Sequence, residues 1–390
     1  MRTSSIAFLL GVASWGVTAT PGVTPSSTLP TSNSTEGENL FPGMVYIGHG
    51  YNAIKGNPFL GDTGGYPEGL SMTTSIFEVT KGNGEPQLWN GDYYQCGADV
   101  ECLPLNTCAS TSEISTSAGA KTLQENLQRS LTVSTGGWFP GTFTASAKYH
   151  EATKTCESND WKVVYLKAEC NLFQMHLKEY STHTLRSDFK NAVSTLSVDA
   201  EASGFGTYTS MIEAFGTHFS STIVMGGQMV QQTTIASSHY DSLHEKGTDF
   251  EAQLTLAWKA ATGNIKADSE KVKIATDIID SSKETQETYY SGGKYFNYDP
   301  EEWSEGLLKD SNVVPIGSGM VLTPITEILS AVDGAGASLY FPDDKNIKAK
   351  ADNMLKALNG YCDSLGVDVC ASDPKDPDPP RAGAVRRHYC

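Results

Sequence analysis

The histidine in the stretch Phe215-Gly216-Thr217-His218-Phe219 is the first residue whose surroundings suggest chemistry. A catalytic histidine needs an acid or hydroxyl partner to orient it or to exchange protons with it. No Asp or Ser partner for His218 is evident in the sequence, which also lacks a Gly-x-Ser-x-Gly elbow, a pair of metal-ligand histidines and a phosphate loop. We therefore expect His218 to be structural, and we expect neither enzymatic activity, nor a metal, nor a cofactor.

The eight cysteines are the other reactive residues. In a secreted protein they are potential disulfide partners, because oxidising compartments let such bonds persist. The near pairs are Cys156 with Cys170 and Cys362 with Cys370. Cys96, Cys102 and Cys108 form an odd group, so that one of them pairs with a distant cysteine such as Cys390 or stays free. Their spacing does not match that of structural zinc sites.

The N-terminal residues have the pattern of a secretory signal. Arg2 precedes an apolar run, Ile6–Val17, and small residues follow, which predicts a signal peptide over residues 1–20. Residues 21–40 are rich in Ser, Thr and Pro and form a leader that includes the glycosylation sequon at Asn33. No later stretch has the length and apolar character of a membrane helix. These features predict a soluble secreted protein.

The formal net charge of −17 limits the classes of partner. Nucleic acid is not expected, because phosphate neutralisation needs clustered Lys and Arg. Bulk attraction to an anionic membrane is not expected either, since such attraction comes from basic residues. Any contact with a lipid membrane must come from a local apolar element. Acid relieves the repulsion among carboxylates, so low pH is expected to promote a change of state.

The elements that position His218 follow from the stretch Tyr208–Gly227. Apolar residues at helical spacing predict a helix that ends at Gly216, and a strand follows over Thr217–Met225. Gly226 and Gly227 then interrupt a continuing strand pattern, where the missing Cβ permits a bend or a close backbone approach.

Periodicity and turn residues predict the other elements. Strands are expected over Met44–Ile47, Leu70–Thr80, Trp161–Leu177 and Tyr289–Tyr298, an extended arm over Lys121–Val133, and helices over Phe189–Leu196 and Asp344–Leu358. Residues 82–120 are expected to be a surface excursion held by disulfides, and residues 363–390 a disordered tail rich in Pro and Asp.

The signature Phe215–Phe219 with the pair Gly226 and Gly227 resembles that of the membrane attack complex/perforin (MACPF) family. The segment Ile47–Asn52 resembles the opening of such domains, and Leu322-Thr323-Pro324-Ile325 resembles their end. Family members usually have Leu-Pro where this chain has Leu196-Ser197. The resemblance covers residues 41–362. It implies an α+β fold like that of MACPF proteins and cholesterol-dependent cytolysins: a bent, central, antiparallel four-stranded sheet, flanked by two helical clusters that can become transmembrane β-hairpins.

The first candidate membrane-inserting segment joins an aromatic turn to an alternating pattern. Apolar or aromatic residues alternate with polar ones after the turn, with a period of two. The arrangement resembles the first transmembrane-hairpin region of perforin-like proteins. Its candidate residues are Trp138, Phe139, Phe143, Ala145, Ala147 and Tyr149.

The second candidate segment has two matched arms around the turn Thr262–Asn264. Each arm has about the 9–11 residues that a tilted strand needs to cross a bilayer, with apolar side chains on one face. The same residues also fit a helix, so we expect a segment that is helical in the soluble form and a β-hairpin after insertion. The candidate residues are Phe250, Ala252, Leu254, Leu256, Trp258, Val272, Ile274, Thr276 and Ile278.

Together these features predict a secreted pore-forming protein for immune defence or toxicity. A lone hairpin in lipid leaves backbone groups unpaired at both edges, so insertion requires a closed barrel and hence a ring of identical subunits. The alternative is a non-lytic MACPF protein acting in adhesion, development or storage. The sequence does not identify a protein or glycan receptor.

Overall fold

The fold is taken from a computed structural model, and the residues that it describes belong to the compact unit Asn33–Cys390. They are residues 40–58, 67–79, 87–89, 92–107, 113–117, 120–134, 142–159, 161–178, 183–200, 204–238, 241, 287–292, 306–307, 313–330 and 340–366.

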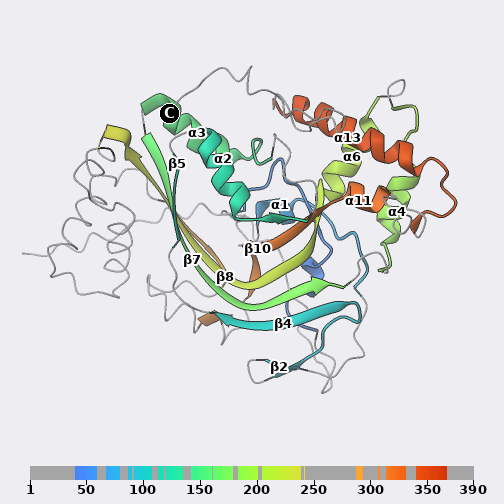
Figure 1. Ribbon diagram of the computed structural model, residues 1–390, viewed down its shortest axis with the longest axis horizontal. Helices are drawn as coiled ribbons and strands as arrows, with labels where there is room; N and C mark the ends of the chain where they lie inside the picture. The colour runs from blue at the N-terminus through green and yellow to red at the C-terminus, as the bar shows by residue number, and fades with distance from the viewer. Residues whose placement is uncertain are drawn as a thin grey trace, which may run out of the picture. The chain divides into compact units, whose positions relative to one another are not determined.

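The centre of the fold is an antiparallel sheet whose long inner strands lie side by side (Figure 1). Its strands follow the order β4 (Val100–Thr107), β7 (Trp161–Leu177), β8 (His218–Ala236), β10 (Val314–Pro324) and β6 (Thr132–Val133). Three shorter strands join it: β5 (Glu113–Ser117) pairs with β7, and β1 (Gly50–Tyr51) and β9 (Glu287–Ser291) pair with β8. The strand predicted over residues 161–177 and the Gly-interrupted strand after Thr217 are confirmed.

Four main strands lie side by side at each end of the sheet, with the two-residue strand β6 outside β10 at one end, although the outer main strands are broken in the middle. At the end nearest the start of β8, the order is β4, β7, β8 and β10. At the opposite end β5 replaces β4 and β9 replaces β10 as neighbours of β7 and β8. We call these the proximal half and the distal half of the sheet. The predicted α+β fold with a bent, four-stranded, antiparallel centre is confirmed.

Two groups of helices accompany the sheet (Figure 1). The first contains α2 (Ala120–Arg129) and α3 (Ala147–Asn159), which contact β5 and β7 respectively. The second contains α4 (Ser187–Ser194), α6 (Gly206–Phe215), α11 (Thr326–Leu329) and α13 (Ile347–Ser364), which contact one another. The helices predicted before Gly216, at Phe189–Leu196 and at the C-terminal side are confirmed, the last one running from Ile347 to Ser364.

The structure contradicts several local predictions. Met44–Tyr46 is a 3₁₀ turn (η1) rather than a strand, and residues 70–80 contain the end of α1 (Glu68–Ser71) and two isolated bridges. The predicted arm over Lys121–Val133 is mostly helix α2. Residues 82–120 are not an irregular excursion, because they supply β4 and β5 of the main sheet and the separate hairpin β2 (Gln87–Trp89) with β3 (Asp92–Tyr94).

The core lies between the sheet and these helices. Leu123 and Leu127, one helical turn apart on α2, are buried, as are Ala152 on α3 and Phe189 on α4. Strand β8 is buried on both faces from His218 to Ile235. It is therefore a central strand that is covered on both sides.

Candidate functional site

The signature residues join helix α6 to strand β8 through a glycine that no other residue can replace. Gly216 ends α6 with φ of 79°, a left-handed conformation, and its N–H donates to the carbonyl oxygen of Ile212 at 2.8 Å. A Cβ at this position would lie 2.5 Å from the backbone of Tyr51. The junction therefore needs glycine both for its backbone angle and for its contact with β1.

Thr217 and His218 complete this junction by polar contacts in the interior. The Thr217 N–H donates to the carbonyl oxygen of Tyr51 at 2.9 Å, and the Thr217 hydroxyl accepts the N–H of Ala53 at 3.1 Å. The same hydroxyl lies 2.8 Å from Nδ1 of His218 and 3.2 Å from the Tyr51 oxygen. All these contacts are compatible when Nδ1 carries the proton and the hydroxyl donates to Tyr51.

Burial determines the charge of His218. Its side chain is 2% exposed, and desolvation lowers its pKa to about 3. A neutral imidazole that is hydrogen-bonded to the neighbouring threonine fits the structural role expected of His218.

Ser220, two residues further along β8, binds the segment before β1. Its hydroxyl donates to the carbonyl oxygen of Tyr46 at 2.6 Å and accepts the N–H of His49 at 3.2 Å. Burial lowers the pKa of His49 as well. The proximal half of β8 is thus fixed to residues 46–53 by a series of side-chain and backbone hydrogen bonds.

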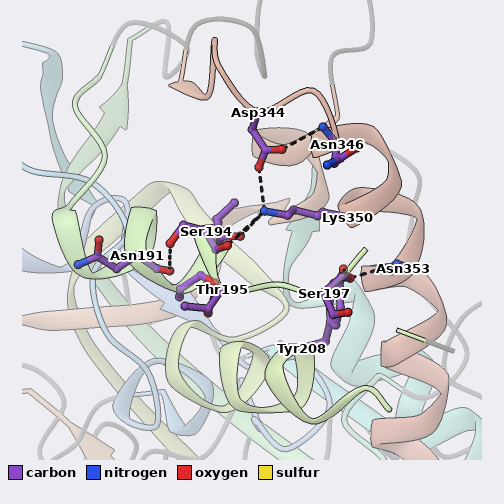
Figure 2. Close-up of polar contacts among 11 residues, drawn as sticks. Asn191, Ser194, Thr195, Ser197, Tyr208, Asp344, Asn346, Lys350 and Asn353 are labelled. Atoms are coloured by element: carbon purple, nitrogen blue, oxygen red, sulfur yellow. Dashed lines mark hydrogen bonds and ion pairs between the residues drawn. The ribbon is translucent and has the colours of Figure 1, made fainter. Parts of the chain in front are cut away.

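Helix α13 holds the helices that lead into the signature (Figure 2). The buried ammonium of Lys350 lies 3.0 Å from the carbonyl oxygen of Val193, at the end of α4, and 2.8 Å from the carboxylate of Asp344. A cation is favourable there because the last carbonyls of a helix carry partial negative charge. The hydrogen bond from Lys350 holds the pKa of Asp344 below its usual range.

The connection between α4 and α6 is bound from both sides. The side-chain amide of Asn353 on α13 donates to the carbonyl oxygen of Val198 at 2.9 Å. The Tyr208 hydroxyl on α6 donates to the carbonyl oxygen of Ser197 at 2.6 Å. Ser197, which stands where family members usually have proline, and the next residue, Val198, are therefore fixed by hydrogen bonds to two helices (Figure 2).

The glycine pair marks the joint between the two halves of the sheet. A Cβ at Gly226 would overlap the carbonyl oxygen of Cys170 on β7, so the close backbone approach expected at this position is present. Opposite it, the β7 register shifts between Asn171 and Phe173, which indicates a β-bulge. The pairing of β8 with β10 ends at Gly226, and its pairing with β9 begins at Gln228. Only β7 and β8 are continuous across this level in the described sheet.

The distal half of β8 carries buried polar side chains. Gln228, Gln231, Gln232, Thr233 and Thr234 are each at most 7% exposed. Within the part of the chain that the structure describes, the side-chain carbonyl oxygens of Gln231 and Gln232 have no hydrogen-bond partner. Burying such groups is unfavourable unless they are hydrogen-bonded.

Four strand ends meet at the distal end of the sheet. Residues 118–160 leave from β5 and return in β7, whose Val163 pairs with Ser117. Residues 237–286 leave from β8 and return in β9, where Gln232 pairs with Glu287. Trp161 pairs with Ala236, so the two inner strands end at the same level. Each segment therefore connects two neighbouring antiparallel strands, as a hairpin does.

The candidate residues of the first hairpin are only partly described. In this structure residues 142–145 are a turn, and Ala147 and Tyr149 lie at the start of α3, which fits the helical cluster expected beside the sheet. Phe143 is fully buried with φ of 66°, and its N–H donates to the carbonyl oxygen of Ala53 at 2.6 Å. The Ala145 N–H likewise donates to the carbonyl oxygen of Ile54 at 3.0 Å. Their membrane-inserting role remains a prediction.

Other candidates lie outside the described residues: Trp138, Phe139, Asn33, Cys370 and the whole second hairpin, Phe250–Ile278. Among the cysteines, Cys96 is bonded to Cys102, and Cys170 and Cys362 are also disulfide-bonded. The pairings of Cys156 with Cys170 and of Cys362 with Cys370 remain predictions.

The exposed hairpin of β2 and β3 was not predicted from the sequence. Leu88 and Tyr93 face each other across its strands and are 62% and 59% exposed. The signal was present, because Asn90-Gly91 between two apolar and aromatic runs is typical of a two-residue β-hairpin turn. The bond between Cys96 and Cys102 lies directly after β3 and connects it to β4. This hairpin is a local apolar element of the kind that a membrane contact requires.

The described ranges contain neither a metal-ligand cluster nor a membrane-spanning helix. No group of three or more His, Cys, Asp or Glu side chains is arranged there to hold a metal ion. None of the helices in those ranges has both the length and the apolar character needed to cross a membrane.

Comparison with known proteins identifies the family. The model of the MAC/Perforin domain matches residues 31–371, so the chain belongs to the MACPF family. GNIP1Aa from Chromobacterium piscinae has a similar structure, with a TM-score of 0.58 and 16% identity over 85% of this chain and 58% of that protein. A putative cell invasion protein with a MAC/Perforin domain from Bacteroides thetaiotaomicron has a TM-score of 0.50 and 11% identity over 83% and 62%. The chain spans about three fifths of the length of each.

Proposed function

We propose that this chain is a secreted pore-forming protein that assembles into a ring on a target membrane and inserts two β-hairpins per subunit. The observation that carries the proposal is the arrangement of strand ends at the distal end of the sheet. Residues 118–160 and 237–286 each connect neighbouring antiparallel strands. If both segments extend, the four strands β5, β7, β8 and β9 lengthen without a change in their order.

The segments are long enough for this conversion. A transmembrane hairpin needs two arms of about 9–11 residues and a turn, and each segment exceeds that length. The described part of residues 118–160 includes helices α2 and α3. Leu123 and Leu127 of α2 and Ala152 of α3 are buried in the core. Conversion would exchange these contacts for contacts with lipid and with other subunits. Pairing with other subunits would close the barrel and hydrogen-bond the backbone groups of the edge strands.

The buried polar residues of distal β8 are consistent with the same proposal. Neither face of Gln228–Ala236 is uniformly apolar, so this half of the strand suits a water-exposed part of a barrel rather than the hydrocarbon region. The lipid-facing residues would then come from the two segments, as the alternation in Phe250–Ile278 predicts. Membrane adsorption could begin at the exposed pair Leu88 and Tyr93.

Dye release from liposomes tests the proposal. Phosphatidylcholine vesicles with and without anionic lipid, at pH 7.5 and pH 5, should leak when the protein is added, and electron microscopy should find rings. Failure to leak under all of these conditions, with membrane binding intact, would favour the non-lytic alternative of an adhesion or developmental protein.

A matched pair of variants tests the second hairpin. Leu254→Lys places a charge on the predicted lipid face, which is unfavourable by about 2–4 kcal/mol near the bilayer midplane. Thr255→Lys places the same charge on the opposite face. Leakage should be abolished by the first substitution and retained by the second, with both proteins secreted as monodisperse species. Equal leakage by both variants would contradict the assigned faces.

A further inference from the structure

Phe143 has a backbone conformation that is unusual for its side chain. Its φ is 66°, and it is the only residue other than glycine with a positive φ in the described ranges. The left-handed region is unfavourable for residues with a Cβ, and for a bulky side chain it is a clear outlier. The ring is fully buried, so the surrounding fold imposes this conformation. Phe143 therefore carries backbone strain in this structure.

Two backbone hydrogen bonds hold the strained turn against another part of the chain. The Phe143 N–H donates to the carbonyl oxygen of Ala53 at 2.6 Å, and the Ala145 N–H donates to that of Ile54 at 3.0 Å. Ala53 and Ile54 are fully buried, so both hydrogen bonds are shielded from water. We call residues 142–146 the latch and residues 53–54 the receiving loop.

Two side-chain contacts hold the ends of the latch. The side-chain amide of Gln124 on α2 donates to the carbonyl oxygen of Thr142 at 2.8 Å. The Ser146 hydroxyl donates to the carboxylate of Glu68, at the start of α1, at 3.2 Å. The latch and Gln124 belong to residues 118–160, whereas Glu68 and the receiving loop do not. The latch therefore attaches the first segment of the proposed conversion to the rest of the chain.

The family signature positions the receiving loop. The Ala53 carbonyl accepts from Phe143, and the Ala53 N–H donates to the Thr217 hydroxyl at 3.1 Å. That hydroxyl lies 3.2 Å from the carbonyl oxygen of Tyr51, which also accepts the Thr217 N–H at 2.9 Å. Ala53 thus lies between the signature and the latch, with one backbone group hydrogen-bonded to each.

We propose that residues 142–146 are a strained latch that holds residues 118–160 on the receiving loop, and that Thr217 is the positioning residue of this loop. Loss of the two backbone hydrogen bonds lets Phe143 leave the left-handed region, so relief of strain favours extension of the segment. The inference rests on the proposed function, because it assumes that the segment extends. It adds a role for the signature threonine in holding that segment.

The first experiment separates the backbone strain from the loss of the ring. Phe143→Ala and Phe143→Gly remove the same ring, but only glycine adopts a φ of 66° without strain. Amide hydrogen exchange of residues 142–146 in the free protein, corrected for intrinsic rates, should be about fivefold faster in the alanine variant. Exchange that is equal in the two variants, or faster in the glycine variant, would overturn the inference.

Tyr149 provides the matched control. It is also a buried aromatic residue of residues 118–160, but it lies in helix α3. Alanine is favoured over glycine in a helix, so exchange of residues 147–159 should be about fivefold slower in Tyr149→Ala than in Tyr149→Gly. The two positions should therefore rank alanine and glycine in opposite order. The same order at both positions would contradict the strain assigned to Phe143.

The second experiment tests the positioning role of Thr217. Thr217→Val removes the hydroxyl that accepts the Ala53 N–H and keeps the shape of the side chain, whereas Thr217→Ser keeps the hydroxyl. Exchange of the latch should be about fivefold faster in the valine variant and close to the wild-type rate in the serine variant. Ser220→Ala should leave the latch unchanged, because that hydroxyl binds residues 46–49 and not the receiving loop.

Two results of this second experiment would reject the role of Thr217. One is unchanged exchange of the latch in a Thr217→Val protein that circular dichroism shows to be folded. The other is an equal increase of exchange throughout the chain, because it would show only a loss of global stability.

Dye release from phosphatidylcholine vesicles connects the latch to the proposed function. Phe143→Ala should cause leakage about fivefold faster than Phe143→Gly, because strain favours extension of the segment. Ala145→Gly controls for the presence of glycine in an extended strand, since Ala145 has no positive φ to relieve. A slowing by Ala145→Gly as large as the difference between the two Phe143 variants would assign that difference to strand formation and contradict the latch.

Exchange and leakage are measured on the same variants, so the two proposals can fail separately. Exchange in the expected order without leakage of any vesicle would reject pore formation and retain the latch. Leakage by Phe143 variants whose latch exchanges at equal rates would reject the latch and retain pore formation. Exchange in the expected order with equal leakage rates would reject the part of the latch in conversion.

Discussion

The two halves of β8 differ in what they contact and in how their polar groups are satisfied. In the proximal half, Thr217 and Ser220 make several hydrogen bonds each to residues 46–53. In the distal half, Gln231 and Gln232 are buried without partners for their side-chain oxygens among the described residues. Satisfied buried groups fix one structure, whereas unsatisfied ones weaken it. The proximal half is thus held to residues 46–53 by side-chain hydrogen bonds, and the pore-forming proposal places the change of surroundings in the distal half.

The largest effect is expected at the joint between the halves. Gly226→Val would force a side chain into the carbonyl of Cys170, and relief would require movement of the two central strands. We expect a loss of more than about 4 kcal/mol in the free energy of unfolding, or no folded protein. Urea unfolding measures it. Gly360→Ala is the control, because a Cβ there meets nothing and alanine in a helix should stabilise by about 0.5–1 kcal/mol. A stable, monomeric Gly226→Val protein would show that the halves can separate freely.

Acid should weaken the proximal half through His218. The pKa of His218 is about 3 in the folded chain and 6.5 in its ordinary state, so between these values only the unfolded chain takes up the proton. Stability therefore falls as the pH drops below 6.5, by about 1.4 kcal/mol per pH unit from this group. His218→Gln should unfold with a shallower pH dependence between pH 6.5 and 4.5. Identical slopes for both proteins would remove His218 as a cause of acid sensitivity.

The helices that lead into the proximal half provide a smaller effect. Lys350→Met leaves the last carbonyls of α4 without their cation, for an expected loss of about 1–3 kcal/mol. Lys348→Met, two residues earlier, should change stability by less than about 0.5 kcal/mol because its side chain is 87% exposed and its pair with Asp352 is solvated. Thermal unfolding of the two variants measures the difference between their stabilities. Equal losses would mean that the buried ammonium contributes no more than a surface charge.

A related pH effect is expected at Asp344. Its pKa is depressed by Lys350, so its contribution to stability is present above its ordinary pKa of 3.8 and is lost as the pH falls below that value. Protonation of His218 in the unfolded chain lowers stability at a higher pH than protonation of Asp344 does. The acid response between pH 6.5 and 4 should therefore be retained in Lys350→Met and reduced in His218→Gln.

The smallest effect on stability is expected in the distal half. Gln232→Leu removes a buried oxygen that has no described partner, so the free energy of unfolding should stay the same or rise by up to about 1 kcal/mol. If this half becomes exposed to water during function, assembly or leakage should nevertheless slow. Ser220→Ala in the proximal half should do the reverse, lowering stability by about 1–2 kcal/mol. A stability loss at Gln232 equal to that at Ser220 would erase the distinction between the halves.

The sequence predicted best where a pattern is long and its contacts are local. The strand Trp161–Leu177 and the helix before Gly216 have many apolar residues at consistent spacing, and both were located to within about two residues. The close backbone approach at Gly226 was also predicted, because a glycine inside a strand pattern indicates such an approach. The family resemblance added the bent, four-stranded sheet.

The alternation over Phe143–Tyr149 is compatible with the helical cluster that the resemblance implies, because small residues such as Ala145 and Ala147 fit a helix equally well, and α3 is stabilised by packing against β7. The failures have physical reasons. In α2, the pair Leu123 and Leu127 at helical spacing was overlooked. Strands β4 and β5 depend on pairing with β7, which lies far along the chain, and local patterns do not encode such partners.

The continuity of β8 through Gly226 has a mechanical consequence. Strand residues advance by about 3.3 Å each, so the part beyond the joint, Gln228–Ala236, is a stiff arm of roughly 30 Å. A rotation of about 20° at its base would sweep the tip by roughly 10 Å, the spacing of two sheet layers. A modest angular adjustment beside a single carbonyl is thereby amplified into a displacement as large as the separation of two packed layers.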